Sequence, residues 1–389
     1  MKKKIQLFIL CLYPLIPLIS SLLGMIKFRN KLGAISFILF GICLNSSLLF
    51  LPNDDITRYI DGYILFRQGY DWIGTVDLYY WITCFFFRGL NLPPYFILIG
   101  WTIMYYLFFY LCLRKLHEYI IPNKIVSVLF FISSLFFINI IQFSSLRFYT
   151  AAFCFIYFLF VLEGKETKPT WRKKSIMLIL PYIHFMYFPI VLYYYLYSFF
   201  RPSLGFLAKA VVITYIFSFM DIGEALGHFA PFLIKQESIS YYTGSRVEQM
   251  NASYNYGKYL YVPMMLSVLY FLYIQIEDFY KNKQVNIHYN MLSCILSFWS
   301  FYNIISVSWD FQMRFRTIVQ FLSIYPILYF MNKKYDVRFE YYKILFPFAF
   351  LFSNYDFFFV SASIFFDFNS LFFDFNSLCN LCISRINKI

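Results

Sequence analysis

The stretch of residues 125–162 contains a single charged side chain, Arg147, near its middle. One membrane span needs about 20 apolar residues, so this stretch is too long for one helix. It predicts two antiparallel helices, over 125–142 and 148–162, with Arg147 at the joint between them. An arginine in or beside hydrocarbon costs about 3 kcal/mol or more, and proteins retain it mostly where it meets an anion or a carboxylate. A snorkelling or purely structural arginine is the alternative.

The composition indicates a membrane protein. Hydrophobic residues make up 61% of the 389 residues and charged residues 14%, whereas soluble domains are roughly 25% charged. Continuous apolar runs replace the alternating pattern of a transmembrane β-barrel, so we expect an all-α, polytopic integral membrane protein. We expect a single domain over 1–389 with about ten transmembrane helices and, in one interpretation, re-entrant segments. The eight cysteines are scattered and predict no disulfide framework.

The net charge of +13 comes largely from basic clusters between apolar runs, at residues 2–4, 114–115, 172–174, 281–283 and 333–334. Short basic loops stay on the cytoplasmic side, so the charge indicates a membrane orientation and predicts no nucleic-acid partner. This orientation places 163–174 in the cytoplasm and makes 52–96 and 221–257 external loops. The spans 97–113, 148–162 and 317–331 then descend to the cytoplasm, and 287–308 rises.

Two other segments have more than one interpretation. The apolar run 175–200 contains two prolines and ends at Arg201, so it is either one bent span or a re-entrant hairpin with His184 at its apex. The hairpin satisfies the positive-inside rule at every later loop, so we prefer it. The segment 5–26 is basic at both ends and is either a span with its N-terminus outside or a kinked hairpin. The low-complexity tail 363–389 contains the heptad FFDFNSL twice, and we assign it no chemistry.

On this topology, polar side chains from distant segments lie at the outer face. Arginine pairs with phosphate oxygens through a forked, bidentate geometry, so outer arginines beside apolar helices suit a lipid-linked diphosphate. A carboxylate or histidine nearby suits general-base activation of a hydroxyl. No cluster of metal ligands appears in the sequence, so we expect no metal and no cofactor. The candidate bases are Asp55, Asp61 and His184, and the candidate binding residues are Arg147, Arg314, Arg316, Arg58 and Arg246.

Five short motifs occur in order along the chain: DDITRYIDGY at 54–63, DLYYWI at 77–82, SLRFYTAA at 145–152, YIHFM at 182–186 and MRFR at 313–316. In this order they resemble the EpsG-like branch of the Wzy-type polysaccharide polymerases. The chain departs from the family pattern at 52–55, which reads PNDD where the family has Gly-Thr-Asp, and after Arg147, where Phe-Tyr replaces Gln-Gly. The first departure affects the preference for Asp55 as the base, and the second affects close packing beside the arginine.

The resemblance implies a GT-C-like membrane glycosyltransferase of the bacterial inner membrane. It would polymerise polyprenyl-diphosphate-linked oligosaccharide repeat units at the outer face, in surface polysaccharide biosynthesis. The diphosphate is the leaving group, stabilised by arginine. Membrane lipid, a flippase and a chain-length regulator are the implied partners.

Two alternatives remain open. A flippase or other transporter of the same lipid-linked oligosaccharide would also need many spans and buried cations, and it predicts an internal repeat. Apart from the terminal heptads, the sequence shows no such repeat. A membrane O-acyltransferase of surface sugars would use His184 but leaves the outer arginines unexplained.

The placement of the basic loops can be tested by labelling. We expect cysteines introduced at Thr57 and Ser240 to react with a membrane-impermeant thiol reagent added outside, and a cysteine at Thr167 to react only after permeabilisation. The measurement is labelling of single-cysteine variants in intact cells, on a background without the native cysteines. Labelling of Thr167→Cys without labelling of Thr57→Cys would contradict the topology.

Overall fold

The structure of this chain is a computed structural model in which every described element is a helix. It describes residues 34–35, 37–39, 41–42, 55–70, 78–118, 145–164, 169–218, 262, 265–266, 268–270, 273, 289–306 and 309–331. No strand occurs among these residues, which confirms the all-α class for this part of the chain. The predicted segments 5–26, 125–142, 221–257 and 363–389 lie outside the described residues.

Two of the described helices are long and apolar enough to cross a membrane, α6 (Tyr95–Glu118) and α9 (Leu146–Glu163). Their apolar parts, Tyr95–Leu116 and Leu146–Glu163, have mean hydropathies of 2.0 and 1.6. Both helices agree with a membrane protein and with the predicted spans 97–113 and 148–162. The larger number of about ten spans stays a prediction.

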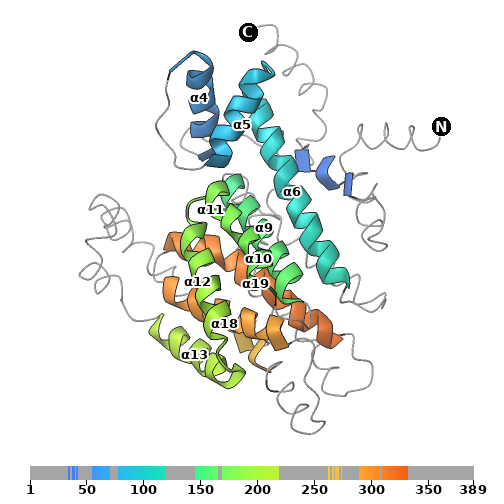
Figure 1. The fold of residues 1–389 in the computed structure, drawn as a ribbon, viewed down its shortest axis with the longest axis vertical. Helices are drawn as coiled ribbons and strands as arrows, with labels where there is room; N and C mark the ends of the chain where they lie inside the picture. Colours follow the sequence, from blue (N-terminus) through green and yellow to red (C-terminus); the bar gives the residue numbers. More distant parts are fainter. Residues whose placement is uncertain are drawn as a thin grey trace, which may run out of the picture.

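The segment 52–96, expected as an external loop, is helical in part. It contains α4 (Asp55–Arg67) and α5 (Leu78–Gly89), which lie together at one end of α6 (Figure 1). The other described elements are α10 (Trp171–Lys174), the 3-10 helix η1 (Ser175–Ile179), α11 (Leu180–Ile183), α12 (Tyr187–Phe200), α13 (Leu204–Phe217), α18 (Tyr289–Ile305) and α19 (Trp309–Met331).

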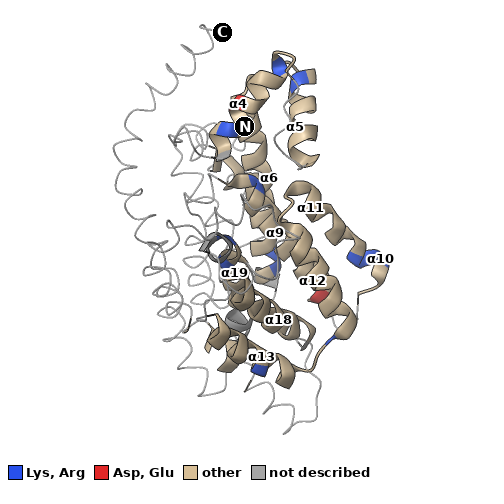
Figure 2. Cartoon of the chain, turned by 90° about the vertical axis from the view of Figure 1, so that its left-hand side faces the viewer, with Lys and Arg blue, Asp and Glu red and all other residues tan. Residues whose placement is uncertain are grey.

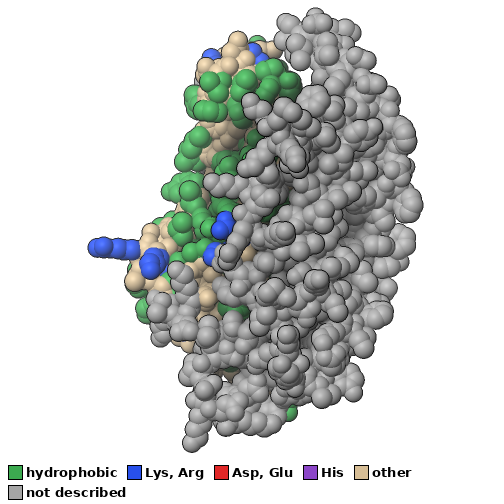
Figure 3. Space-filling view, turned by 90° about the vertical axis from the view of Figure 1, so that its right-hand side faces the viewer, with side chains coloured by type: hydrophobic (Ala, Val, Ile, Leu, Met, Phe, Trp, Pro, Cys, Tyr) green, Lys and Arg blue, Asp and Glu red, His purple; other side chains and the backbone are tan. Residues whose placement is uncertain are grey.

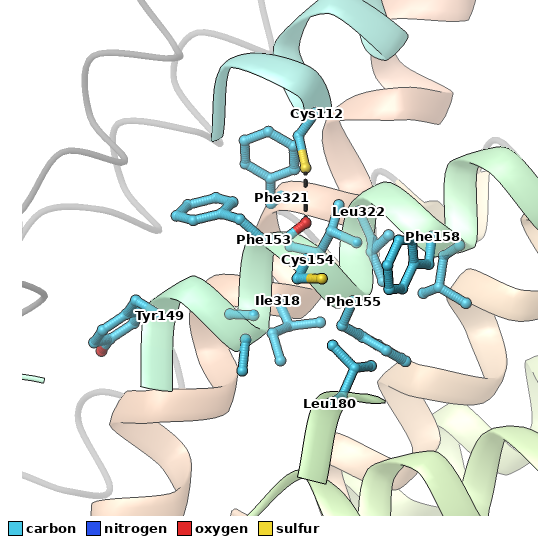
Figure 4. Close-up of a cluster of buried hydrophobic side chains, with 14 of the residues drawn as sticks. Cys112, Tyr149, Phe153, Cys154, Phe155, Phe158, Leu180, Ile318, Phe321 and Leu322 are labelled. Carbon is cyan, nitrogen blue, oxygen red and sulfur yellow. Dashed lines mark hydrogen bonds between the residues drawn. The ribbon is translucent and has the colours of Figure 1, made fainter. Parts of the chain in front are cut away.

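Helix α9 is the most buried element of the described bundle. Nearly all of its residues are buried, and it packs against α6, α18 and α19. The ring of Phe153 lies 4.6 Å from that of Phe109 on α6 and 5.5 Å from that of Phe321 on α19. The Cys112 thiol donates a hydrogen bond to the Phe153 carbonyl at 3.0 Å, so α6 approaches α9 closely (Figure 4).

Contacts along α9 give the directions of its neighbours. On α19, Phe315 packs against Phe148 near the start of α9, and Tyr325 packs against Phe160 near its end, so the two helices are parallel. Helices α6 and α12 also run parallel to α9, and α18 runs antiparallel to α12. These relative directions agree with those expected from the basic loops.

Residues 171–200 form a helical hairpin, which decides against the single bent span. The chain runs through α10, η1 and α11, turns at residues 184–186 and returns as α12 (Figure 1). The two arms meet at the open end, where the Tyr195 hydroxyl donates to the Lys174 carbonyl at 2.9 Å and the Trp171 ring stacks on Tyr195. Each of the two prolines lies in the first turn of a helix, where its missing N–H needs no partner.

A buried ion pair joins three helices at this open end. Glu163, the last residue of α9, is fully buried, accepts a hydrogen bond from the Tyr194 hydroxyl at 2.9 Å and pairs with Arg201 at 3.4 Å. Arg201 also donates to Asn290 Oδ1 on α18 at 3.1 Å. Its backbone has a φ of +40°, in the left-handed region that costs a non-glycine residue about 1 kcal/mol. This conformation ends α12, where the Arg201 backbone N–H donates to the Tyr197 carbonyl at 2.8 Å.

The ion pair should contribute measurably to stability. We expect Glu163→Ala to lower the free energy of unfolding by about 3 kcal/mol, because it leaves Arg201 and Tyr194 without their buried acceptor. Glu163→Gln keeps an acceptor for Tyr194 and should cost less. Thermal unfolding of the purified variants in one detergent measures both effects. Equal stability of the wild type and Glu163→Ala would contradict a structural role for the pair.

Candidate functional site

Arg147, the second residue of α9, is surrounded by aromatic rings. The residue is only 3% exposed, and its guanidinium carbon lies 3.7 Å from the ring centre of Tyr59, 5.4 Å from that of Trp101 and 5.6 Å from that of Tyr80. The three rings come from α4, α6 and α5, and we call them the aromatic cage. A cation over an aromatic face gains about 2 kcal/mol or more when it is desolvated. The cage therefore offsets part of the cost of burying this charge.

Hydrogen bonds connect the helices that carry the cage. The Tyr80 hydroxyl donates to the Tyr59 carbonyl at 2.9 Å, which ties α5 to α4. The Trp101 indole N–H donates to Thr83 Oγ1 at 3.4 Å, which ties α6 to α5. The rings of Tyr59 and Trp101 also meet edge to face, with centroids 5.6 Å apart. The segment 52–96 therefore supplies Tyr59 and Tyr80 to the surroundings of Arg147.

The next residue, Phe148, brings two further candidates to this end of α9. Its ring meets the His184 imidazole edge to face with centroids 5.4 Å apart, and the Arg314 guanidinium carbon lies 5.8 Å from the same ring centre. The ring of Phe315, which follows Arg314, packs on Phe148 at 5.3 Å. His184 and Arg314 thus lie on the ring of Phe148, and Arg147 is the residue before it; we call these three residues, from distant parts of the sequence, the polar cluster.

His184 lies in the turn between α11 and α12. Arg147 and Arg314 both interact electrostatically with its ring. Its Nδ1 accepts a hydrogen bond from the Met186 N–H at 3.3 Å, and Arg314 Nη1 lies 3.3 Å from the Met186 sulfur. Because Nδ1 accepts a hydrogen bond, this bond assigns the proton of the neutral ring to Nε2. In this tautomer Nε2 carries the proton, so it is available as a hydrogen-bond donor and not as a base.

A small pocket lies beside the polar cluster. Among the described residues it leaves room for about one water molecule. A larger anion therefore reaches Arg147 only when neighbouring side chains move. The lining residues are Ile56, Tyr59, Trp101, Ser145, Leu146, Arg147, Phe148 and His184.

The remaining candidates come from the two segments expected to be external, 52–96 and 221–257. Arg58 and Asp61 are exposed on α4. Asp55 is the first residue of α4, immediately before the pocket residue Ile56. Arg246 lies outside the described residues. Along the chain, Asp55 adjoins the lining residue Ile56 and Arg58 adjoins the lining residue Tyr59.

The two late arginines differ in their surroundings. The sequence predicts both arginines before a span that begins at 317, but α19 begins at Trp309, so both lie inside the helix. Arg314 joins the polar cluster, whereas Arg316 is 1% exposed and buried elsewhere in the bundle. A separation of two residues turns a side chain roughly 200° around an α-helix, which explains the difference.

Little in the amino-acid sequence indicates the aromatic cage. Tyr59 and Tyr80 occur within two of the motifs, but Trp101 occurs in an ordinary apolar run. Because aromatic residues make up 25% of this chain, an aromatic residue with a special role does not stand out. Met186 likewise carries no signal beyond its position two residues after His184.

Neither metal ligands nor known relatives point to a function. Among the described residues, no group of three or more His, Cys, Asp and Glu side chains could hold a metal ion. Comparisons with protein-family models, curated proteins and solved structures find no match for this chain. The functional argument therefore rests on the residues of the site.

A double-mutant cycle tests the contact between Arg147 and the cage. We expect Tyr59→Leu and Arg147→Met to show a coupling free energy of about 1–2 kcal/mol, since the guanidinium and the ring stabilise each other in a desolvated place. Chemical or thermal unfolding of the single and double variants supplies the four values. Tyr59→Leu combined with Arg88→Met, an exposed arginine on α5, is the matched control and should be additive. Additivity in both cycles would rule out the cation–π contact.

Proposed function

We propose that this chain is a membrane glycosyltransferase that polymerises polyprenyl-diphosphate-linked oligosaccharide repeat units at the outer face of the bacterial inner membrane. The meeting of Arg147, His184 and Arg314 at one end of the apolar helix α9 is the observation that carries the proposal. Two guanidinium groups and an imidazole N–H form a suitable donor set for a diphosphate. The resemblance of the motifs to the Wzy-type polymerases supports the same substrate.

In the proposed reaction, the polar cluster holds the diphosphate as the glycosidic bond to it breaks. Arg147 and Arg314 stabilise the negative charge that develops on the leaving oxygen, and the Nε2–H of His184 donates to the same group. Burial makes these interactions stronger than they would be in water, because the local dielectric is low. The pocket has room for about one water molecule, so lining side chains shift when the diphosphate enters.

A carboxylate is the better base for the acceptor sugar hydroxyl. His184 is arranged as a donor, and Asp61 is exposed on α4. Asp55 begins the helix whose residues Ile56 and Tyr59 line the pocket, so it is our preferred base.

The test is polymerisation by the purified protein in vitro. We expect Arg147→Lys and Arg314→Lys each to lower the polymerisation rate about 10²-fold, because lysine does not reproduce the forked hydrogen bonds to phosphate oxygens. Arg88→Lys, at an exposed arginine that contacts Phe66, is the matched control and should polymerise at the wild-type rate. The readout is product length from lipid-linked repeat units.

Several outcomes would reject the proposal. Wild-type rates from both Arg147→Lys and Arg314→Lys, at equal expression, would make these arginines structural. Movement of the lipid-linked oligosaccharide across vesicles without polymer formation would favour the flippase. Acyl transfer to the sugar in place of polymerisation would favour the O-acyltransferase.

A further inference from the structure

We propose that the open end of the hairpin binds the headgroups of anionic phospholipids at the cytoplasmic surface of the membrane. The site consists of Trp171, Arg172, Lys173 and Lys174 of α10, together with Arg201. This inference goes beyond the proposed glycosyl transfer and does not depend on it, since it concerns the end of α9 opposite to Arg147.

The outer face of the hairpin is apolar along its whole length. On α12, large apolar side chains that are 48% to 70% exposed recur at helical spacing, and the other arm carries a similar set that is 46% to 57% exposed. A contiguous exposed apolar surface of this extent marks contact with a membrane or a partner. The residues are Phe188, Leu192, Leu196 and Phe199 on α12, and Ile176, Leu178, Ile179 and Tyr182 on the other arm.

Trp171 marks the limit of this apolar face. It is 57% exposed, yet its ring is held by a parallel stack on Tyr195, with centroids 5.8 Å apart and planes 4° apart. The Lys174 ammonium lies 4.5 Å from the centre of the Trp171 ring. Tryptophan concentrates at membrane–water interfaces, where its ring lies at the level of the headgroups. A fixed, exposed indole at the end of an apolar face fits that position.

Positive charge begins where the apolar face ends. Arg172 and Lys173 are exposed on α10, which lies at one side of the bundle (Figure 2). Lys174 and Arg201 lie closer to the bundle and interact with Glu163. Among the residues that the structure describes at this end, four are cations and one is a carboxylate. Figure 3 shows basic side chains that project beside a largely hydrophobic surface of the described part.

The combination of features identifies the partner. A basic cluster beside a membrane attracts anionic headgroups. A nucleic acid or an acidic soluble protein would satisfy the cations but leave the apolar face in water. A phospholipid satisfies both, because its chains cover the hairpin while its phosphate lies beside Arg172 and Lys173. The short helix α10 places the basic side chains directly beside the apolar face of the hairpin.

Quenching of Trp171 fluorescence tests the proposal on the full chain. The protein is placed in phosphatidylcholine nanodiscs that contain either brominated phosphatidylglycerol or brominated phosphatidylcholine at the same mole fraction. The Trp171 signal is the difference between the wild type and Trp171→Phe. We expect stronger quenching by the brominated phosphatidylglycerol.

Charge variants identify the residues responsible. The double variant Arg172→Gln with Lys173→Gln removes two charges of the site. At low salt, the preference for phosphatidylglycerol should weaken about 5-fold for each charge removed. Arg88→Gln with Lys209→Gln removes two exposed charges elsewhere and should keep the preference. Equal quenching by the two lipids, or an undiminished preference in the Arg172 and Lys173 variant, would overturn the proposal. Equal losses in both double variants would also overturn it, because they would reflect net charge alone.

Discussion

A guanidinium group buried at the end of an apolar helix constrains everything packed around it. Placing a charge in or beside hydrocarbon is unfavourable, and the faces of Tyr59, Tyr80 and Trp101 offset part of that cost for Arg147. Because these rings come from α4, α5 and α6, one side chain connects the N-terminal described helices to the centre of the bundle. The site and the packing of this part of the fold are therefore the same set of contacts.

Much of the described bundle could be predicted because hydropathy and charge act on whole segments. The apolar run at 148–162 appears as α9, and the basic loops predicted the relative directions of its neighbours. The charges of the flanking loops favour the hairpin, but the residues of the run itself do not distinguish it from a bent span, since both contain the same prolines. The stack of Trp171 on Tyr195 brings the two arms together and decides the question.

The candidate site could be predicted only in part. Arg147, His184 and Arg314 are polar residues in apolar surroundings, so the sequence itself draws attention to them. Choosing between Arg314 and Arg316 requires the rotational position of α19, which hydropathy does not supply in a helix that is buried on most sides. The cage is not predictable from the sequence, because cation–π contacts depend on three-dimensional proximity and this chain has many aromatic residues.

The length of α9 has a consequence for the membrane itself. With a helical rise of about 1.5 Å per residue, Arg147 and Glu163 lie roughly 24 Å apart along the axis. The hydrocarbon core of a typical bilayer is about 30 Å thick, so a bilayer crossed by α9 would have its two surfaces beyond these two charged side chains. Such a bilayer would thin around the bundle, or the guanidinium would stay beneath the level of the headgroups. Longer acyl chains would increase this mismatch, and bilayer thickness would then act on the surroundings of Arg147.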